Sequence, residues 1–350
     1  MKGPVVLVRA VLLATVVVLL AGLALVACGG SGAPVATSPS PTSAVTDLGG
    51  VPSLTDVMSA ESTSSGPSVS IPTVQPGEKP PAFAVLRTMF AYDETEPLGY
   101  TAEASGMDVP AGAVCKWITF QSQGSTATGY LVTPKGPGPY PVVLFAHGWG
   151  MGAEHWLDQA GAVARKGYAS LLVDEVGSSA YYTYDADLEL PAWVQYVIQT
   201  RRALDLIETL PQLDASRIGF VGLSNGGTLG GLLAGVDDRV KAYVLLGAAG
   251  MLKSGQWERR HEKDTPIRSA AAFARWKARV SVIDYVTYVS HARGRILFLA
   301  GNTDTLAVDE ARDCLAAAPA RKTLHVYKGD HYPVPAAANA YWRAWMVRNL

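Results

Sequence analysis

The residues best suited to chemistry lie between Arg217 and Gly227, where an apolar run turns through a Gly-x-Ser-x-Gly pentapeptide into a glycine-rich segment. A serine hydroxyl at the tip of a tight strand-to-helix turn stands clear of the sheet, and the next backbone N–H can point at a developing oxyanion. Gly222 and Gly226 have no Cβ, so they leave room for such a turn. We therefore interpret Ser224 as a nucleophile, with a plain glycine-rich turn as the alternative.

A serine nucleophile needs a base to remove its proton, and the base needs a third group that holds its tautomer and stabilises its charged form. Two late apolar runs are followed by suitable groups. Asp304 comes just after the run 296–300, and His331 comes just after the run 324–327. The sequence therefore predicts Asp304 as the acid and His331 as the base for Ser224.

Both partners have competitors. Asp330 adjoins the histidine, but neighbouring residues rarely aim their side chains at each other, and Asp309 is the next fallback for the acid. The histidines expected to be solvated, packed or otherwise structural are His155, His261, His291 and His325.

The loop from Phe145 to Gly150 follows the first long apolar run and supplies a second expected feature. An oxyanion hole needs two N–H donors, and we assign the backbone amides of Trp149 and Asn225. We expect His147 to form hydrogen bonds within this loop rather than to act as a second base.

The elements that position these residues follow a regular order. Alternating residues at 115–120 and 127–133 predict an antiparallel hairpin. Apolar β-rich runs then alternate with helical patterns, one at 154–166 and one opening at Pro191. The runs are 142–146, 169–173, 218–221, 242–246, 296–300 and 324–327. Continuous Val, Leu and Ile runs are typical of strands buried on both faces of a parallel sheet.

From about Gly129 to the C-terminus the chain resembles the α/β-hydrolase superfamily, especially its dienelactone-hydrolase-like and acyl-peptidase-like serine esterases. The motifs that carry the resemblance are HGWG at 147–150, GLSNGG at 222–227, GNTDTLAV at 301–308 and GDHYPV at 329–334. Their order along the chain, nucleophile then acid then base, is that of the superfamily. The resemblance implies a mostly parallel central sheet with helices on both faces, and cleavage of small carboxylic esters. Dienelactone hydrolases use a cysteine where this chain has Ser224, so that particular activity is not expected.

Two segments near the expected site leave alternatives open. Residues 250–293 carry no strong strand signal and form either a small helical cap over the mouth of the site or a surface excursion. The tyrosines in Tyr181–Tyr184 form, with Trp149, either an aromatic wall for acyl or aryl groups or ordinary surface packing.

Several function classes are disfavoured. A formal charge of −1 without a long Lys/Arg run argues against a nucleic-acid partner. No cluster has metal-ligand spacing and no glycine-rich nucleotide fingerprint is present, so neither a metal nor a cofactor is expected. Acyl transfer, amide or peptide hydrolysis by the same triad, and a non-catalytic envelope lipoprotein of the same fold remain alternatives. The sequence specifies no oligomeric state.

The N-terminal segment predicts export. Lys2 and Arg9 flank a short positive region, and residues 10–27 are apolar apart from Thr15. The tetrapeptide Leu25-Val26-Ala27-Cys28 resembles the lipobox of bacterial lipoproteins, in which the cysteine is lipidated and becomes the new N-terminus. We therefore expect a signal peptide at 1–27 and a lipid anchor at Cys28 on the outer face of the cytoplasmic membrane. An uncleaved membrane helix and a soluble secreted protein are the alternatives.

Residues 28–80 are rich in Ser, Thr, Pro and Gly, which predicts a flexible tether, with an ordered arm as the alternative. The catalytic domain is then expected over 81–350. Its two cysteines, Cys115 and Cys314, fall on an early strand and a late helix, so we expect two small buried apolar residues rather than a disulfide.

Overall fold

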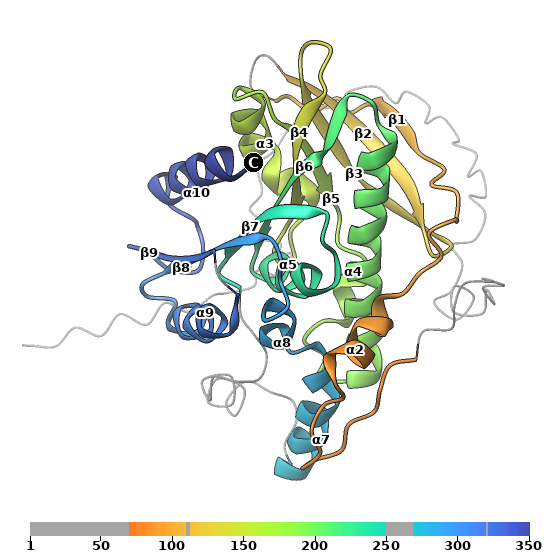
Figure 1. Ribbon diagram of the computed structural model, residues 1–350, viewed down its shortest axis with the longest axis vertical. Coiled ribbons are helices and arrows are strands. Elements are labelled where there is room, and N and C mark those ends of the chain that lie inside the picture. Colours follow the sequence, from red (N-terminus) through yellow and green to blue (C-terminus); the bar gives the residue numbers. More distant parts are fainter. Residues whose placement is uncertain (1–69, 110–112, 249–268, 320) are drawn as a thin grey trace, which may run out of the picture. The chain divides into compact units, whose positions relative to one another are not determined.

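The computed structural model describes residues 70–109, 113–248, 269–319 and 321–350 (Figure 1). The expected signal peptide, Cys28, most of the tether, the first part of the expected cap and His261 lie outside the described residues. No helix in the described part of the chain combines the length and hydropathy needed to cross a bilayer.

Within the described residues, the strands form one sheet in the order β1-β2-β3-β5-β4-β6-β7-β8-β9. Its antiparallel strands are β1 (Thr101–Ala104), β2 (Ala113–Ser122) and β3 (Ser125–Pro134). Its parallel strands are β4 (Tyr140–Ala146), β5 (Ala169–Val173), β6 (Leu213–Leu223), β7 (Val240–Leu246), β8 (Arg295–Gly301) and β9 (Lys322–Tyr327). β3 joins the two parts by pairing antiparallel with β5. The mostly parallel sheet predicted from the sequence is confirmed.

Helices cover both faces of this sheet (Figure 1). The α-helices of the described residues are α2 (Phe83–Leu86), α3 (Leu157–Ala164), α4 (Ala186–Thr209), α5 (Asn225–Val236), α7 (Ala270–Val280), α8 (Tyr285–Val289), α9 (Thr305–Ala317) and α10 (Ala336–Asn349). Core residues of α4, α5 and α8 share one hydrophobic cluster, and those of α3 and α10 share the other.

Alternate side chains of a central strand enter these two clusters. On β4, Val142 and Leu144 belong to one cluster while Val143 and Phe145 belong to the other, and all four are at most 1% exposed. A strand with both faces buried needs apolar residues at every position. This requirement explains the uninterrupted Val, Leu and Ile runs in the sequence.

The hairpin turn and the helix end predicted from the sequence are both present in the structure. The β2–β3 hairpin turns at Gln123 and Gly124, which both have positive φ (52° and 73°), as a tight hairpin turn requires. The helix predicted at 154–166 is a 3₁₀ turn at Ala153–Trp156 followed by α3. Gly167, with φ of +83°, comes shortly after its end.

The start of α4 differs from the prediction. The helix begins at Ala186, and Pro191 lies inside it. Asp185 caps the helix, because its side chain accepts a hydrogen bond from the backbone N–H of Asp187 at 2.9 Å. The aspartate cap therefore sets the start of the helix one turn earlier than the proline alone suggested.

Residues 269–293 of the expected cap are described, and they pack as helices on the domain. α8 belongs to the core: a Cβ added at Gly231 would lie 2.2 Å from the ring of Tyr285, and one added at Gly235 would lie 2.5 Å from the carbonyl oxygen of Tyr288. α7 lies alongside the first turns of α4, where Trp276 donates a hydrogen bond to Glu189 at 2.7 Å. α8 is therefore a covering layer of α5 and not a cap.

The folded part also starts earlier than the expected boundary at residue 81. Val74 is 3% exposed and belongs to the same cluster as α4 and α5. The end of the expected tether is thus packed onto the domain. Neither described cysteine forms a disulfide, as predicted; Cys314 is fully buried, but Cys115 is only half-buried, so the expectation of burial is wrong for Cys115.

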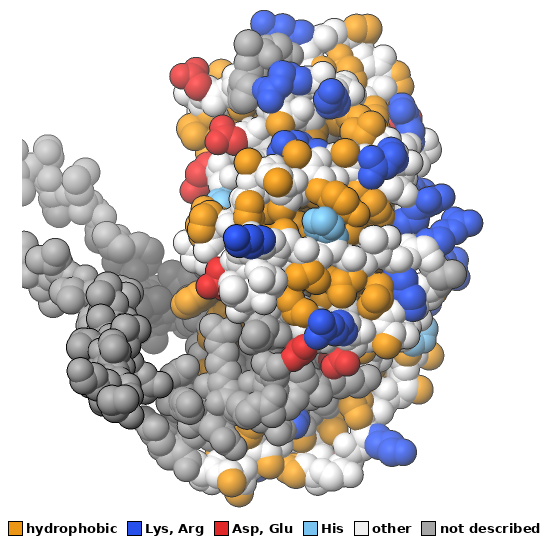
Figure 2. Space-filling model, turned by 90° about the vertical axis from the view of Figure 1, so that its left-hand side faces the viewer, with side chains coloured by type: hydrophobic (Ala, Val, Ile, Leu, Met, Phe, Trp, Pro, Cys, Tyr) orange, Lys and Arg blue, Asp and Glu red, His pale blue; other side chains and the backbone are white. Residues whose placement is uncertain are grey.

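Figure 2 shows the side of the molecule that carries β9, the last strand of the sheet. Lys and Arg side chains lie among and around the hydrophobic ones on this side. Val326 of β9 is 41% exposed, and His325 stacks on Tyr341 of α10 with ring centroids 3.8 Å apart. His325 is a packing residue, as expected. Charged side chains near an edge strand oppose pairing with another chain.

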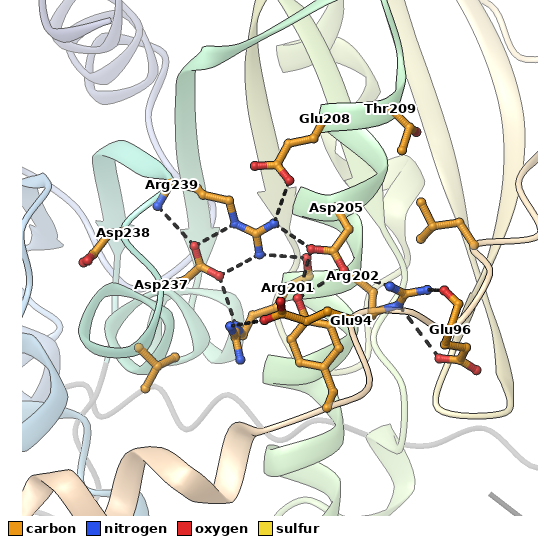
Figure 3. Close-up of a pocket in the computed structure, with 13 residues that line it drawn as sticks. Glu94, Glu96, Arg201, Arg202, Asp205, Glu208, Thr209, Asp237, Asp238 and Arg239 are labelled. Carbon is orange, nitrogen blue, oxygen red and sulfur yellow. Dashed lines mark hydrogen bonds and ion pairs between the residues drawn. The ribbon is translucent and has the colours of Figure 1, made fainter. Parts of the chain in front are cut away.

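An ion-pair network borders a cavity of about 600 Å³ between α4 and the segment before β7 (Figure 3). Asp237 is its centre, since its carboxylate accepts hydrogen bonds from Arg201 at 3.0 Å and from Arg239 at 2.7 Å. Arg239 also reaches Asp205 of α4 at 2.6 Å. Burial raises the pKa of Asp237, but the hydrogen bonds and charges of the two arginines outweigh this and hold it below its ordinary value. Because Asp237 precedes β7, this network lies at the opposite edge of the parallel sheet from Ser224.

We predict that Asp237→Asn lowers the free energy of unfolding by about 3 kcal/mol at pH 7, because it removes the buried carboxylate charge that pairs with both Arg201 and Arg239. Asp238→Asn is the matched control, since Asp238 pairs with Arg293 in a largely exposed bridge and should change stability by at most about 1 kcal/mol. Urea denaturation measures both.

Because the pKa of Asp237 is lowered, the stability difference between Asp237→Asn and the parent depends on pH in a definite direction. The stabilisation by ionised Asp237 is present above the unfolded pKa and is lost as the pH falls through the folded pKa. The difference between Asp237→Asn and the parent should therefore shrink in acid. Equal unfolding midpoints for the parent and Asp237→Asn at pH 7 would contradict this account of the network.

Candidate active site

Ser224 lies between the end of β6 and the start of α5, in a backbone conformation that is rare for a residue with a side chain. Its φ is 54° and its ψ is −114°. Its N–H donates to the carbonyl oxygen of Leu246 at 2.8 Å, and its carbonyl oxygen accepts from the N–H of Thr228 at 2.9 Å. Strained backbone of this kind persists only where the surroundings fix it, and it is common at functional sites.

The two glycines around Ser224 are required by close backbone contacts. A Cβ at Gly222 would lie 2.0 Å from the carbonyl oxygen of Gly226, and a Cβ at Gly226 would lie 2.3 Å from the carbonyl oxygen of Ala146. The first contact lies within the turn, and the second joins α5 to the end of β4. The expectation that these glycines make room for a tight strand-to-helix turn is confirmed.

His331 and Asp304 are in direct contact. The distance from Nδ1 of His331 to Oδ2 of Asp304 is 2.6 Å, and the Asp304 side chain is only 7% exposed. The other carboxylate oxygen of Asp304 accepts from the N–H of Ala307 at 3.2 Å and caps α9. Because a carboxylate only accepts, Nδ1 of His331 carries a hydrogen, and Nε2 of the neutral ring is an acceptor.

The loops after β8 and β9 are fastened to each other, which explains this contact. Thr303 donates its backbone N–H to the carbonyl oxygen of Gly329 at 3.0 Å, and Gly329 donates its own to the Asn302 side chain at 2.9 Å. A Cβ at Gly301 would lie 2.5 Å from the carbonyl oxygens of Gly329 and Asp330. Residues distant in sequence are thereby held at one place.

The end of β7 connects this pair to Ser224. Leu246 accepts the backbone N–H of Ser224, and the next residue, Gly247, borders the imidazole. A Cβ at Gly247 would lie 3.0 Å from both Nδ1 and Cε1 of His331, and the φ of Gly247 is +55°. The structure therefore places Ser224, Asp304 and His331 after the carboxyl ends of β6, β8 and β9, next to the end of β7.

The competitors for the acid have other partners. Asp330 accepts the backbone N–H of His331 at 2.7 Å, and Asp309 pairs with Arg312 at 3.1 Å. Of the other histidines, His291 stacks on Phe83 with centroids 3.6 Å apart, and His155 is half-buried. Burial, the neighbouring His147 and, in the opposite sense, Glu154 leave the pKa of His155 below its ordinary value.

His147 is a structural residue, as expected. It is 2% exposed, and the backbone N–H of Glu175 donates to its Nε2 at 3.1 Å. Its Nδ1 must therefore carry the hydrogen, which it donates to the carbonyl oxygen of Gly148 at 2.9 Å. A Cβ at Gly148 would lie 3.4 Å from the Cβ of Ser224, so this loop borders the nucleophile turn.

The tyrosines of the segment after β5 do not all have the same role: one is ordinary packing and another is part of an aromatic surface. Tyr181 is 3% exposed and packs on Trp193, with centroids 4.7 Å apart. Tyr182 is 37% exposed, donates its hydroxyl hydrogen bond to Oδ1 of Asn225, and lies edge-on to Trp149 with centroids 5.3 Å apart. Tyr181 is core, whereas Tyr182 and the 53%-exposed Trp149 are aromatic surface beside Ser224.

Glu175 is a residue of the site that the sequence analysis passed over. Its Oε1 accepts a hydrogen bond from Nδ2 of Asn225 at 3.3 Å. Burial raises the pKa of Glu175 to about 7, although this hydrogen bond lowers it. Its position directly after a buried strand was the available signal, since the loops at those ends face the site. Its neighbour Asp174 has a structural role instead, because its carboxylate accepts hydrogen bonds from the Thr128 hydroxyl and from the backbone N–H of Ala153.

Chemically, the arrangement offers a hydroxyl on a fixed turn, an imidazole and a buried carboxylate that orients the imidazole through Nδ1. Such a set can activate a hydroxyl for attack on an acyl carbon. No group of three or more His, Cys, Asp or Glu side chains among the described residues could hold a metal ion.

Comparisons with known proteins identify similar sequences and folds. The family model described as "Esterase FrsA-like" matches residues 101–254. The Mus musculus protein "Acyl-coenzyme A thioesterase 2, mitochondrial" is 29% identical over 116 residues, which are 33% of this chain and 24% of that protein. The chain thus spans about a quarter of the length of this curated relative.

Two solved structures share the fold. Acetyl xylan esterase from Paenibacillus sp. R4 has a TM-score of 0.60 at 20% identity, covering 76% of this chain and 92% of that chain. Dienelactone hydrolase from Anabaena variabilis ATCC 29413 has a TM-score of 0.50 at 19% identity, covering 68% of this chain and 99% of that chain. The chain therefore has the α/β-hydrolase fold, as its motifs indicated. The matched family model describes esterases and covers less than half of the chain.

We predict that Gly222→Ala lowers the free energy of unfolding by roughly 3 kcal/mol or more, because the added methyl group would overlap the backbone of Gly226. Gly106→Ala is the control: Gly106 also has positive φ, +66°, but open space around it, so only about 1 kcal/mol of backbone strain is expected. Urea denaturation compares them, and similar losses in the two variants would show that the turn is not crowded.

Proposed function

We propose that this protein is a serine hydrolase that cleaves carboxylic esters through Ser224, His331 and Asp304. The observation that carries the proposal is the 2.6 Å contact between the His331 imidazole and the buried Asp304 carboxylate, beside the end of β7 that also holds the Ser224 turn. The match to the esterase family supports the ester as substrate. That match includes Ser224 and the HGWG loop and ends before Asp304 and His331.

In the proposed mechanism, Nε2 of His331 takes the hydroxyl proton as Ser224 attacks the acyl carbon. Asp304 holds the imidazole through Nδ1 and stabilises its charged form. The backbone N–H groups of Trp149 and Asn225 hold the oxyanion of the tetrahedral intermediate. The imidazolium then gives its proton to the departing alcohol. Water attacks the acyl-enzyme with His331 again as base, and Ser224 is released with the carboxylic acid.

We predict that Asp304→Asn lowers kcat for p-nitrophenyl acetate by about a thousand- to ten-thousandfold, because an amide favours the wrong tautomer of the imidazole and cannot stabilise its charge. Asp309→Asn is the matched control and should change kcat less than about threefold, since Asp309 lies on the exposed side of α9 with Arg312. Ser224→Ala provides the background rate. If Asp309→Asn and Asp304→Asn were equally active, Asp304 would not be the acid.

A thioester substrate is a second candidate, because one relative is an acyl-coenzyme A thioesterase. Acyl transfer to an alcohol or amine, or hydrolysis of an amide or peptide, would use the same three residues. Product analysis with competing acceptors separates these reactions: a hydrolase yields only the free acid, whereas a transferase yields the new ester or amide.

We also propose that the protein is exported and anchored through a lipid on Cys28 to the outer face of the cytoplasmic membrane. The apolar segment 10–27 and the Leu-Val-Ala-Cys sequence support this proposal. The Ser/Thr/Pro-rich residues up to about 69 would then hold the domain away from the membrane surface.

We predict that Cys28→Ala shifts the protein from the membrane fraction to the soluble fraction, or stops its maturation at the precursor mass. Lipidation needs the thiol, and acyl chains supply the membrane affinity. Cell fractionation with mass measurement tests this. Cys115→Ala is the control and should leave partitioning unchanged. An unaltered membrane fraction in Cys28→Ala would indicate an uncleaved helix instead.

A further inference from the structure

Glu175 stands out because its carboxyl group is buried beside the site and only one of its two oxygens has a hydrogen-bond partner. Oε1 accepts the hydrogen bond from Nδ2 of Asn225, while Oε2 is inaccessible to solvent and has no hydrogen-bond partner. The inference below rests on the proposed function, since Asn225 is there the residue whose backbone N–H holds the oxyanion.

Asn225 is held from two sides. Its Oδ1 accepts from the hydroxyl of Tyr182, and its Nδ2 donates to Glu175. The amide orientation follows from the two partners, because a hydroxyl can donate to the oxygen and a carboxyl oxygen must accept. Tyr182 has a φ of 60°, which is unfavourable for a bulky residue and indicates that its place is fixed by these contacts. Asn225 itself is 2% exposed and is the first residue of α5.

Within the part of the chain that the structure describes, Glu175 has no cationic partner. The ionisable groups that face it are Asp174 beside it, His147 from the loop after β4, Tyr181 and Tyr182 from its own loop, and Tyr196 from α4. The Nε2 of His147 is already occupied by the backbone N–H of Glu175. Among the described residues, no Lys or Arg forms an ion pair with Glu175. A buried carboxylate without a cation is costly, whereas the neutral acid can still accept from Asn225 through Oε1.

We propose that Glu175 is a positioning residue that works as a neutral carboxylic acid, holding Asn225 for the oxyanion, and that its ionisation slows hydrolysis. Negative charge develops on the substrate oxygen next to Asn225 during attack. A second negative charge on Glu175, one side chain away and poorly screened, opposes it. The uncharged acid keeps the hydrogen bond and adds no repulsion. Burial, which raises the pKa of Glu175 to about 7, keeps a large fraction neutral in ordinary conditions.

The pH dependence follows with a definite sign. Glu175 must be protonated, so the rate falls as the pH increases through the pKa of Glu175. We therefore expect kcat/KM of the wild-type protein to decline in alkali, and to be about tenfold or more below its maximum at pH 9.

The test compares wild type, Glu175→Gln and Glu175→Ala on p-nitrophenyl acetate between pH 5 and pH 10. Glutamine keeps an acceptor oxygen without the ionisation, so Glu175→Gln should retain wild-type kcat near the maximum within about threefold, lose the alkaline decline, and exceed wild type about tenfold at pH 9. Glu175→Ala removes the acceptor and should have a kcat about tenfold below the wild-type maximum, without an alkaline decline. Superimposable pH profiles for wild type and Glu175→Gln would overturn the proposal.

Two further readouts keep the inference separate from folding and from the proposed function. If Glu175→Gln fails to fold, infrared difference spectroscopy of the wild-type protein should show a buried protonated carboxyl that titrates near pH 7; its absence overturns the proposal. If wild type hydrolyses no ester, or Ser224→Ala is equally active, the proposed function fails. If wild type is active through Ser224 but Glu175→Gln keeps the alkaline decline, only the present inference fails.

Discussion

The site depends on how closely the backbone approaches itself at the carboxyl ends of β6, β7 and β8. The Ser224 turn leaves no space for a Cβ at Gly222 or Gly226, and the loops after β8 and β9 leave none at Gly301. Backbone hydrogen bonds then fasten each loop to its neighbour, as when Leu246 accepts from Ser224 and Leu299 accepts from Gly247. Because these contacts involve main-chain atoms, they fix the directions of the side chains that leave the loops.

This crowding brings three residues from distant parts of the chain to one edge of the sheet. A parallel sheet places the carboxyl ends of its strands on one edge, so any residue that directly follows a strand is a candidate for the site. Asp304 follows β8, His331 follows β9 and Ser224 follows β6. The charged network around Asp237 lies at the opposite edge, where it ties α4 to the start of β7. One edge of the sheet thus carries the proposed catalytic residues, and the other carries ion pairs.

Much of this arrangement could be predicted from the sequence because its signals are local. Continuous apolar runs marked the parallel strands, glycine pairs marked the tight turns, and the residues after those strands indicated where Ser224, Asp304 and His331 would lie. The predicted start of α4 was wrong. Pro191 is the stronger sequence signal for a helix start, but Asp185 caps the helix and sets its boundary. The packing of α8 could not be predicted, because no local pattern in residues 285–289 shows that their tyrosines pack against Gly231 and Gly235.

The environment of Glu175 could not be predicted in the same way. A glutamate after a strand is ordinarily solvated, and only the packing of Tyr181, Tyr196 and Asn225 around it buries the carboxyl group. Glu189 is a similar case, since it is 3% exposed and accepts from the backbone of Tyr184 and the indole of Trp276. Burial also raises the pKa of Glu189 to about 7. Electrostatics of this kind depends on tertiary contacts, which no local pattern encodes.

The most direct test of the account is to treat the folded protein with a fluorophosphonate and map the modified peptide by mass spectrometry. The account predicts one adduct, on Ser224, formed in the wild-type protein and absent from His331→Ala, because the hydroxyl reacts only when the imidazole removes its proton. A folded wild-type protein that stays unmodified, or an adduct that forms equally without His331, would contradict it.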